Sequence, residues 1–277
     1  MTCMTRCMTH LWGPRGAPYD RTDPAPMAAP LAVGTPTSAP LYKEVKRLLT
    51  ASMQAREWEP GAALPSETRL AARFHVSIGT LRKAVDELVA EQVLVRQQGR
   101  GTFVATHGPS RLMFQFFRIV RADGEKQLPE PELLGFERGR AEAREATALR
   151  IAPGERVLRV RNLLRLGGEP IVLDDIVLAQ AVFPDLAERA FRARNSTIYN
   201  LYQTRYGINV VRASEQLRTA RADRTTAKIL TVEPGTPLLE IERVAMTYHS
   251  APVELRRSLV NTAHHAYANE LGKSHGV

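Results

Sequence analysis

The chain has 277 residues and a hydrophobic content of 44%, which indicate a globular protein of one large or two ordinary domains. No apolar run approaches the roughly 18 residues that span a bilayer, and the N-terminus lacks the apolar core of a signal peptide. These features exclude a membrane protein and predict a cytoplasmic location. The net charge of +9 suits a polyanionic partner, but residues 41–106 carry only ten Lys and Arg against seven Asp and Glu.

Residues 1–39 are rich in Pro, Ala, Gly and Thr without periodicity, so we predict an unstructured tail. The two cysteines, Cys3 and Cys7, lie in this tail with neither zinc-site partners nor a disulfide framework. We therefore expect no metal site and no cofactor, and a reducing compartment fits.

Three helices are predicted between residues 41 and 90. An apolar face recurs at helical spacing from Leu41, and a Pro-Gly turn follows it. Ser66 is a good N-cap for the second helix, and Ser77 is one for the third. The apolar face of the third helix would pack inward. Its opposite face is then polar and basic, with Gly79, Thr80, Arg82 and Lys83.

A short hairpin follows, with predicted strands at 93–96 and 102–104 and a tip at 97–101. Gly99 and Gly101 permit positive φ angles and a close approach of the backbone to a partner. Arg100 between them could clamp a phosphate or enter a minor groove. This order of elements is typical of a winged helix-turn-helix. The second helix of that motif lies in the major groove of DNA, and here its DNA-reading part would be residues 77–83.

These residues resemble the GntR family of bacterial repressors. The matching blocks, in order and with matching gaps, include Leu64-Pro65-Ser66-Glu67, Val76-Ser77 and Gln98-Gly99-Arg100-Gly101-Thr102-Phe103-Val104. The resemblance implies a DNA-binding domain at residues 40–106. It places the family's operator contacts on Arg69, Ser77, Gly79, Thr80, Arg82, Gln98, Gly99 and Arg100. Many members have arginine where this chain has Ile78, so we expect one phosphate or guanine contact to be missing.

Residues 107–114 are a compositional break that we interpret as a linker. Beyond it we predict strands at 112–117, 156–166, 170–178, 210–220, 238–249 and 253–260, helices at 142–149, 196–206 and 225–230, and a polar loop through Pro131. Hairpins mixed with helices favour an α+β domain around an antiparallel sheet. Two Pro-Gly segments, at 152–155 and 232–237, each lead into strand, turn and strand. The two halves are therefore expected to pair as a pseudo-symmetric sheet.

Residues 115–268 are similar to the ligand-sensing UTRA domain of the HutC branch of the GntR family, a fold that looks related to chorismate lyase; residues 269–277 would be a C-terminal tail. The similarity implies an effector site with an acid at Asp174, a hydroxyl at Thr197, a phenol at Tyr199 and an acid at Glu254. Two parts of the chain differ from the effector site of UTRA domains. The arginine pair that holds phosphorylated effectors falls on Asn162 and Leu164, and the phosphate-binding Ser/Thr stretch falls on residues 114–117, with Phe114 and Phe116.

Two lost guanidiniums would cost about 1.5 to 3 kcal/mol each at a phosphate site. We therefore expect a neutral or aromatic metabolite or a small amine as the effector, and not a phosphorylated sugar.

Together these patterns predict a repressor, released by a small molecule, that binds a pseudo-palindromic double-stranded operator as a homodimer. We find no nucleophile elbow, phosphate loop, metal motif or acid-base pair, so we predict no catalytic residue. Two alternatives remain open at this stage. The second domain could be an enzyme of chorismate lyase-like fold, or the protein could be an interaction module.

Overall fold

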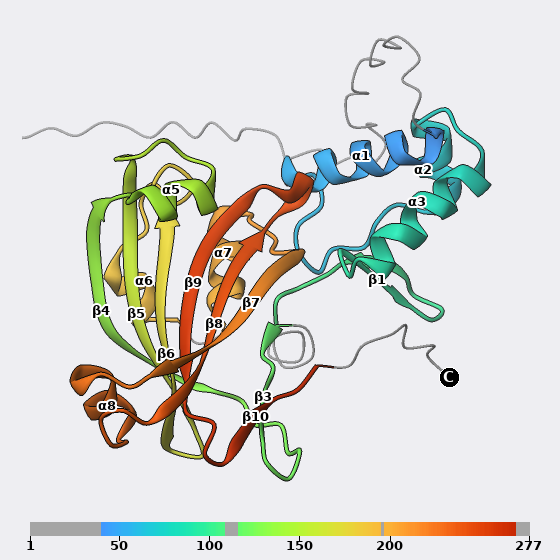
Figure 1. Cartoon of the computed structure of the whole chain (residues 1–277). Coiled ribbons are helices and arrows are strands. Elements are labelled where there is room, and N and C mark those ends of the chain that lie inside the picture. Colours follow the sequence, from blue (N-terminus) through green and yellow to red (C-terminus); the bar gives the residue numbers. More distant parts are fainter. Residues whose placement is uncertain (1–39, 109–115, 195–196, 270–277) are drawn as a thin grey trace, which may run out of the picture. The chain divides into compact units, whose positions relative to one another are not determined.

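The computed structural model describes residues 40–108, 116–194 and 197–269. Residues 40–104 form three helices and a hairpin: α1 (Leu41–Gln54), α2 (Glu67–Arg73), α3 (Ile78–Ala90), β1 (Leu94–Gln97) and β2 (Gly101–Val104). Leu49 of α1 and Leu81 and Leu88 of α3 are fully buried between the helices. This order, visible in Figure 1, confirms the predicted winged helix-turn-helix.

The starts of α2 and α3 are fixed by serine caps, as the sequence predicts. The Ser66 hydroxyl accepts a hydrogen bond from the Arg69 amide at 3.3 Å, and the Ser77 hydroxyl accepts one from the Thr80 amide at 3.1 Å. A cap of this kind contributes about 1 kcal/mol and satisfies an amide that lacks a partner within the helix. The Ser77 cap therefore sets where the exposed N-terminal turn of α3 begins.

Residues 116–194 and 197–269 build a six-stranded antiparallel sheet. Its strands are β4 (Glu130–Arg140), β5 (Arg156–Leu166), β6 (Glu169–Ala179), β7 (Arg212–Arg221), β8 (Pro237–Met246) and β9 (Pro252–Val260), in the order β4-β5-β6-β9-β8-β7. The two three-stranded halves meet where β6 pairs with β9. This arrangement confirms the pseudo-symmetric sheet that the repeated Pro-Gly segments predict.

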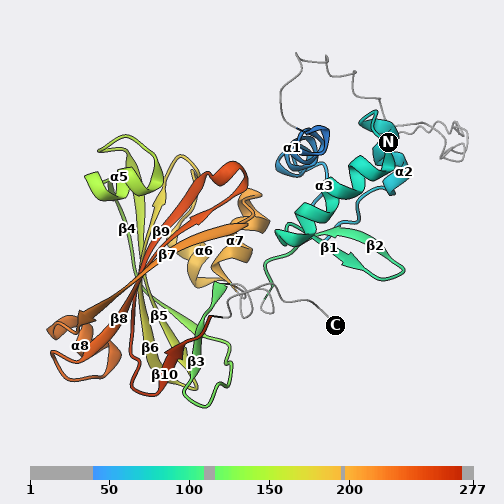
Figure 2. The same ribbon diagram turned by 45° about the vertical axis from the view of Figure 1, so that its right-hand side comes forward.

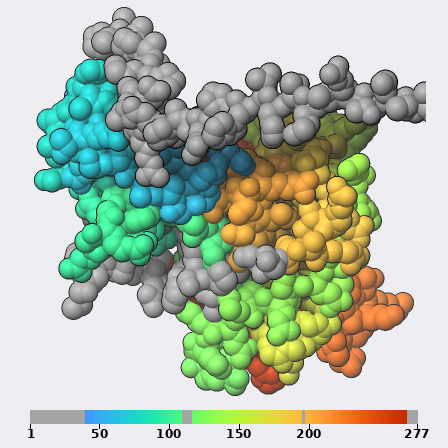
Figure 3. Space-filling model, turned by 180° about the vertical axis from the view of Figure 1, so that it is seen from behind, coloured from blue at the N-terminus to red at the C-terminus, as the bar shows by residue number. Residues whose placement is uncertain are grey.

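Helices cover both faces of this sheet. On one face α6 (Glu188–Arg192) and α7 (Ile198–Tyr206) pack through Phe191 and Tyr202, which are fully buried. On the other face α5 (Ala143–Leu149) and α8 (Arg224–Leu230) form two smaller clusters with the sheet, and they lie at its opposite ends (Figure 1). In the view from behind, the yellow and orange residues of α6 and α7 hide the sheet (Figure 3).

Three short elements complete the fold. The strands β3 (Ile119–Arg121) and β10 (His265–Tyr267) pair as a separate two-stranded ribbon, which packs on sheet residues such as Leu164 and Val260. The 3₁₀ turn η2 (Tyr248–Ser250) joins β8 to β9. Figure 2 shows the ribbon at the ends of the central strands.

The structure corrects two sequence-based assignments. Residues 112–115 lie outside the described residues, but Phe116 and Phe117 are not in a strand, and β3 begins only at Ile119. The polar loop expected through Pro131 ends earlier, because β4 begins at Glu130. None of the residues of β4 is buried, since it is an edge strand, so it lacks the apolar alternation by which strands are recognised.

Candidate nucleic-acid interface and effector cavity

The predicted DNA-binding residues lie on α2, on the N-terminal part of α3 and at the tip of the hairpin. Of these residues, Arg69, Ser77, Gly79, Arg82, Lys83, Gln98, Gly99 and Arg100 are exposed and Thr80 is half-buried. The Thr80 hydroxyl lies 2.9 Å from the Ser77 hydroxyl, within the capped turn. The turn is therefore both rigid and accessible.

Arg82 is held by an acidic residue at the start of the preceding helix. Its side chain is 62% exposed, and its Nε donates to the Glu67 carboxylate at 2.5 Å. Glu67 also lies 3.7 Å from the Arg96 guanidinium. An exposed pair of this kind contributes about 0–1 kcal/mol, so Arg82 can exchange Glu67 for a DNA group at little cost.

The hairpin tip has the positive φ angles that its two glycines predict. Gly99 and Gly101 have φ angles of 70° and 111°, in the region that favours glycine. The Arg100 guanidinium carbon lies 5.7 Å from the centroid of the Phe103 ring, so it is held close to the hairpin. Lys83 is likewise beside an aromatic ring, because its ammonium lies 4.2 Å from the centroid of the Tyr42 ring on α1.

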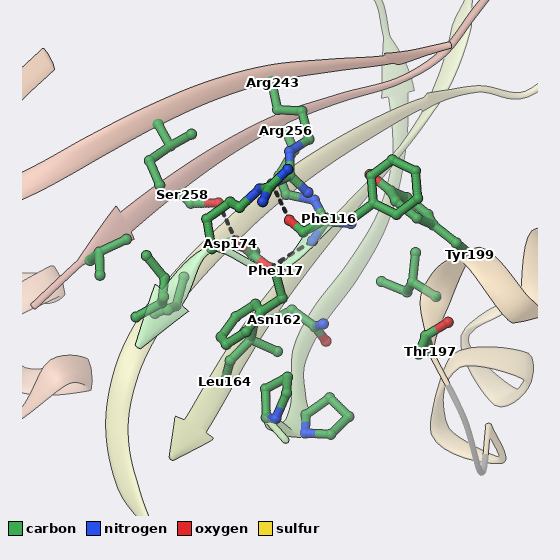
Figure 4. A pocket seen from close by; sticks show the side chains of 18 of the residues that line it. Phe116, Phe117, Asn162, Leu164, Asp174, Thr197, Tyr199, Arg243, Arg256 and Ser258 are labelled. Atoms are coloured by element: carbon green, nitrogen blue, oxygen red, sulfur yellow. Dashed lines mark hydrogen bonds and ion pairs between the residues drawn. The ribbon is translucent and has the colours of Figure 1, made fainter. Parts of the chain in front are cut away.

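A cavity of about 420 Å³ lies on the face of the sheet that α6 and α7 cover (Figure 4). Its floor is formed by β5, β6, β8 and β9, and its walls by residues 116–119, residues 128–131 and the start of α7. Apolar side chains dominate the lining: Phe116, Phe117, Ile119, Leu128, Pro129, Pro131, Leu164, Val172, Ile198, Ile241 and Val260. A volume of this size and such a lining are typical of a small-molecule site.

Most of the predicted effector residues meet at this cavity. Phe116, Asn162, Asp174, Thr197 and Tyr199 line it. Glu254 does not line it, but lies behind Tyr199, whose hydroxyl donates to it at 3.1 Å. Phe114 falls outside the described residues. The Thr197 hydroxyl caps α7 by accepting a hydrogen bond from the Asn200 amide at 3.0 Å, so this atom is already engaged.

A buried network of charges forms the floor around Arg256. Its guanidinium binds Glu254 through two bonds of 3.0 Å and donates to Asp174 at 3.1 Å. The Ser258 hydroxyl donates to the other Asp174 oxygen at 2.5 Å, and the Tyr202 hydroxyl donates to Glu254 at 2.8 Å. Figure 4 shows the Asp174, Arg256 and Ser258 side chains converging on the same point. Both acids are therefore hydrogen-bonded within the protein and share one guanidinium.

The electrostatics of this network keep its donors protonated. Burial raises the pKa of Tyr199 to about 12, and the charge of Glu254 adds to this rise. Burial acts to lower the pKa of Arg256, but the carboxylates of Glu254 and Asp174 outweigh it and raise that pKa well above the usual value. Near neutral pH the phenol donates and the guanidinium stays charged.

Three further arginines line the cavity, Arg118, Arg194 and Arg243, and the sequence analysis singled out none of them. Arg243 donates through Nε to Glu215 at 2.6 Å and through Nη2 to the Phe116 carbonyl at 2.5 Å. Arg194 follows α6 and donates to the Phe191 carbonyl at 2.6 Å and to the Asn162 side-chain oxygen at 3.2 Å.

The sequence holds a signal for some of the missed residues. Glu254, Arg256 and Ser258 alternate along β9, so one polar face of that strand was recognisable. Arg194 lies between two helices, where no periodicity indicates its direction.

The described residues contain no group of three or more His, Asp or Glu side chains placed to hold a metal ion. None of their helices has the length and the hydropathy needed to cross a membrane. The arrangement is thus suited to binding: an exposed basic turn on one domain and an enclosed, largely apolar cavity on the other. These features define a DNA-binding regulator that responds to a small molecule.

Comparison with known families confirms this class. The family model described as "Bacterial regulatory proteins, gntR family" matches residues 41–104, and the UTRA domain model matches residues 125–266. The chain belongs to the GntR family of bacterial regulatory proteins and carries a UTRA domain.

Individual relatives agree with this assignment. The histidine utilization repressor of Pseudomonas aeruginosa is 30% identical over 227 residues, which cover 80% of this chain and 86% of that protein. The mannosyl-D-glycerate transport/metabolism system repressor MngR of Escherichia coli is 25% identical over 224 residues, which cover 80% of this chain and 92% of that protein. Both are transcriptional regulators, and this chain is one too, not an enzyme.

The fold of the second domain also has a solved counterpart. The ligand-binding domain of a protein from Bordetella bronchiseptica, described as a GntR-family transcriptional regulator, superposes with a TM-score of 0.55. The two are 35% identical, and the match covers 57% of this chain and 99% of that structure.

Proposed function

We propose that this chain represses transcription by binding a pseudo-palindromic operator as a homodimer, and that a small molecule bound in the cavity releases it. The observation that carries the proposal is the capped, solvent-exposed N-terminal turn of α3 with Arg82 held outward beside a glycine-tipped wing. Two similar proteins are named as repressors, which supports repression over activation. Since the operator would be chromosomal, we place the protein in the cytoplasm.

Two groups of DNA contacts follow from this geometry. The residues on the exposed turn of α3 would meet base edges: Ser77, Gly79, Thr80 and Arg82. The residues at its border and on the wing would bind phosphates or a minor groove: Arg69, Lys83, Gln98, Gly99 and Arg100. Phosphate contacts fix the register of a protein on DNA, and base contacts supply the specificity.

Dimerisation is needed because one winged helix reads only a half-site. A two-fold axis relating two chains would place two α3 helices on a pseudo-palindrome. Light scattering of the protein as it elutes from a size-exclusion column is expected to give twice the chain mass of 30.8 kDa. Titration of operator DNA with the protein should give two chains per operator. A monomer that binds one half-site with full affinity would contradict this part of the proposal.

An effector in the cavity would act by binding one arrangement of the two DNA-binding domains more tightly than the other. A coupling free energy of about 1–3 kcal/mol changes operator affinity roughly 5- to 150-fold, which is enough for induction. We further propose that the effector is not a phosphorylated sugar, because positions 162 and 164 carry Asn and Leu where such sensors carry arginines.

The first residue of α3 is expected to alter which operator is chosen. Ile78 is 40% exposed, and an exposed apolar side chain at this position can contact a thymine methyl group but cannot bind guanine. Replacing it by arginine, Ile78→Arg, should shift the preferred base from thymine to guanine, by about 1–3 kcal/mol of discrimination. Selection from randomised duplexes measures the shift, with the unaltered protein selected in parallel; an identical preferred sequence for both would contradict it.

The proposed function itself is tested by gel retardation. The full chain should select one duplex class from a randomised pool and retard it against excess nonspecific DNA. Addition of a small molecule that binds the cavity should reduce this retardation. Failure to enrich any sequence would overturn the proposal.

A further inference from the structure

We infer that the effector is a small monocarboxylate with an apolar or aromatic body, and that its carboxylate binds Arg194. This inference rests on the proposed function in one respect, since it takes the cavity to be the effector site. It adds the chemical class of the ligand and the side chain that recognises it.

Arg194 is a cation whose hydrogen bonds go to uncharged groups. It lines the cavity and is half-buried, and its two hydrogen bonds go to neutral oxygens of Phe191 and Asn162. Among the described residues no carboxylate forms an ion pair with it. Burial lowers its pKa, because the charged form is poorly solvated there, and the charge of Asp174 opposes this fall without reversing it. A ligand carboxylate would give the guanidinium a direct acidic partner through charge-assisted hydrogen bonds.

The acids of the cavity are not available to a ligand. Asp174 and Glu254 are 0% exposed, and both are bound to Arg256. The expectation of a small amine rested on these two residues. Because an amine would meet Arg194 and no accessible acid, we replace that expectation with an anion.

Two of the other arginines of the cavity are already bound to acids of the protein. Arg256 is bound to two acids, and Arg243 is bound to Glu215 and to the Phe116 carbonyl. Arg194 and Arg118 also line the cavity, and among the described residues neither forms an ion pair. The guanidinium of Arg194 is placed by hydrogen bonds to two neutral oxygens, so we assign the ligand carboxylate to it and use Arg118 as a test below.

The surroundings of Arg194 also favour an anion. Thr197, Ile198 and Tyr199 form the start of α7 and line the cavity, and the first amides of a helix lack partners within it. Asn162 on β5 accepts a hydrogen bond from Arg194, so the cation reaches the site from the segment after α6. The rest of the cavity is apolar, so the body of the ligand should be apolar too.

The test compares ligands that differ only in their polar group. Isothermal titration of the full chain, without DNA, uses 3-phenylpropionate, its neutral amide 3-phenylpropanamide, 3-phenylpropylamine and glucosamine 6-phosphate. We expect the carboxylate to bind at least about tenfold more tightly than each of the others. Equal binding of acid and amide, tighter binding of the amine or the sugar phosphate, or binding of none of the four would overturn the inference.

Variants then identify the side chain. Arg194→Gln should reduce the affinity for 3-phenylpropionate by about tenfold or more and leave that for the amide within about twofold. Arg194→Lys should retain part of the affinity, which separates a lost charge from a misfolded site. Arg192→Gln is the matched control, because Arg192 on α6 is exposed and paired with Glu188. Loss of acid binding in Arg118→Gln but not in Arg194→Gln would contradict the assignment.

The readout also separates this inference from the proposed function. Acid-selective binding by a protein that retards no operator would refute only the proposed function. Specific retardation by a protein that does not prefer the acid would refute only the inference.

Discussion

Arg82→Ala is expected to weaken specific operator binding by about 1–3 kcal/mol, which is roughly 5- to 150-fold, without unfolding the domain. Arg82 lies on the exposed side of α3, and only an exposed ion pair with Glu67 holds it there. Its replacement leaves no buried group unpaired. Since a base contact discriminates among sequences, the loss should be larger on the selected operator than on random DNA. Gel retardation at a fixed salt concentration, with circular dichroism of both proteins, measures it.

The matched control is Arg192→Ala, which removes the same charge from an exposed ion pair on α6, within the other domain. Its operator affinity should stay within about twofold of the unaltered protein, because an exposed charge that makes no DNA contact is screened by salt. If both variants lose equal affinity, or if Arg82→Ala binds the operator normally, α3 does not read the DNA through Arg82.

Arg256→Leu is expected to destabilise the sheet domain by about 3–5 kcal/mol. The guanidinium is the shared partner of Asp174 and Glu254, and both acids are completely buried. Removing it leaves two charges without compensation in a region of low dielectric constant. Scanning calorimetry of the full chain should show a lower transition temperature for this domain, while the winged-helix transition stays unchanged.

The stability that Arg256→Leu loses should depend on pH. Burial raises the pKa of Asp174, and Arg256 opposes the rise. Without Arg256 the folded-state pKa moves further above its unfolded value, so the folded protein binds the extra proton at low pH. Stability is then retained at low pH and is lost as the pH rises through the folded pKa, so the deficit should be larger near about pH 8 than near about pH 5.

Two variants make the Arg256 prediction specific. Adding Asp174→Asn and Glu254→Gln to Arg256→Leu should recover part of the lost stability, because neutral amides tolerate burial better than unpaired carboxylates. Arg161→Leu is the control on the same sheet. Its ion pair with Asp175 is exposed, so its loss should cost no more than about 1 kcal/mol. Equal destabilisation by Arg161→Leu and Arg256→Leu would show that burial of the network is not what matters.

Local patterns in the sequence were sufficient for the DNA-binding domain. Ser66 and Ser77 begin their helices, and Gly99 and Gly101 have the backbone angles of a tight tip. In each case the deciding interaction lies within a few residues along the chain, so the sequence alone specifies it. The repeated Pro-Gly segments likewise predicted the paired halves of the sheet, since each half is a local hairpin preceded by a helix.

The sequence by itself determined the elements of the winged helix-turn-helix, the two main hairpins of the sheet and the family to which the chain belongs. The tertiary structure alone decided which charges remain available to a ligand. Asp174 and Glu254 were expected to be ligand-binding acids, but strand pairing places Arg256 against both, and Arg194 reaches Asn162 across 32 residues of sequence. Such compensation depends on side chains brought together across the sheet, and no local pattern of residues records it.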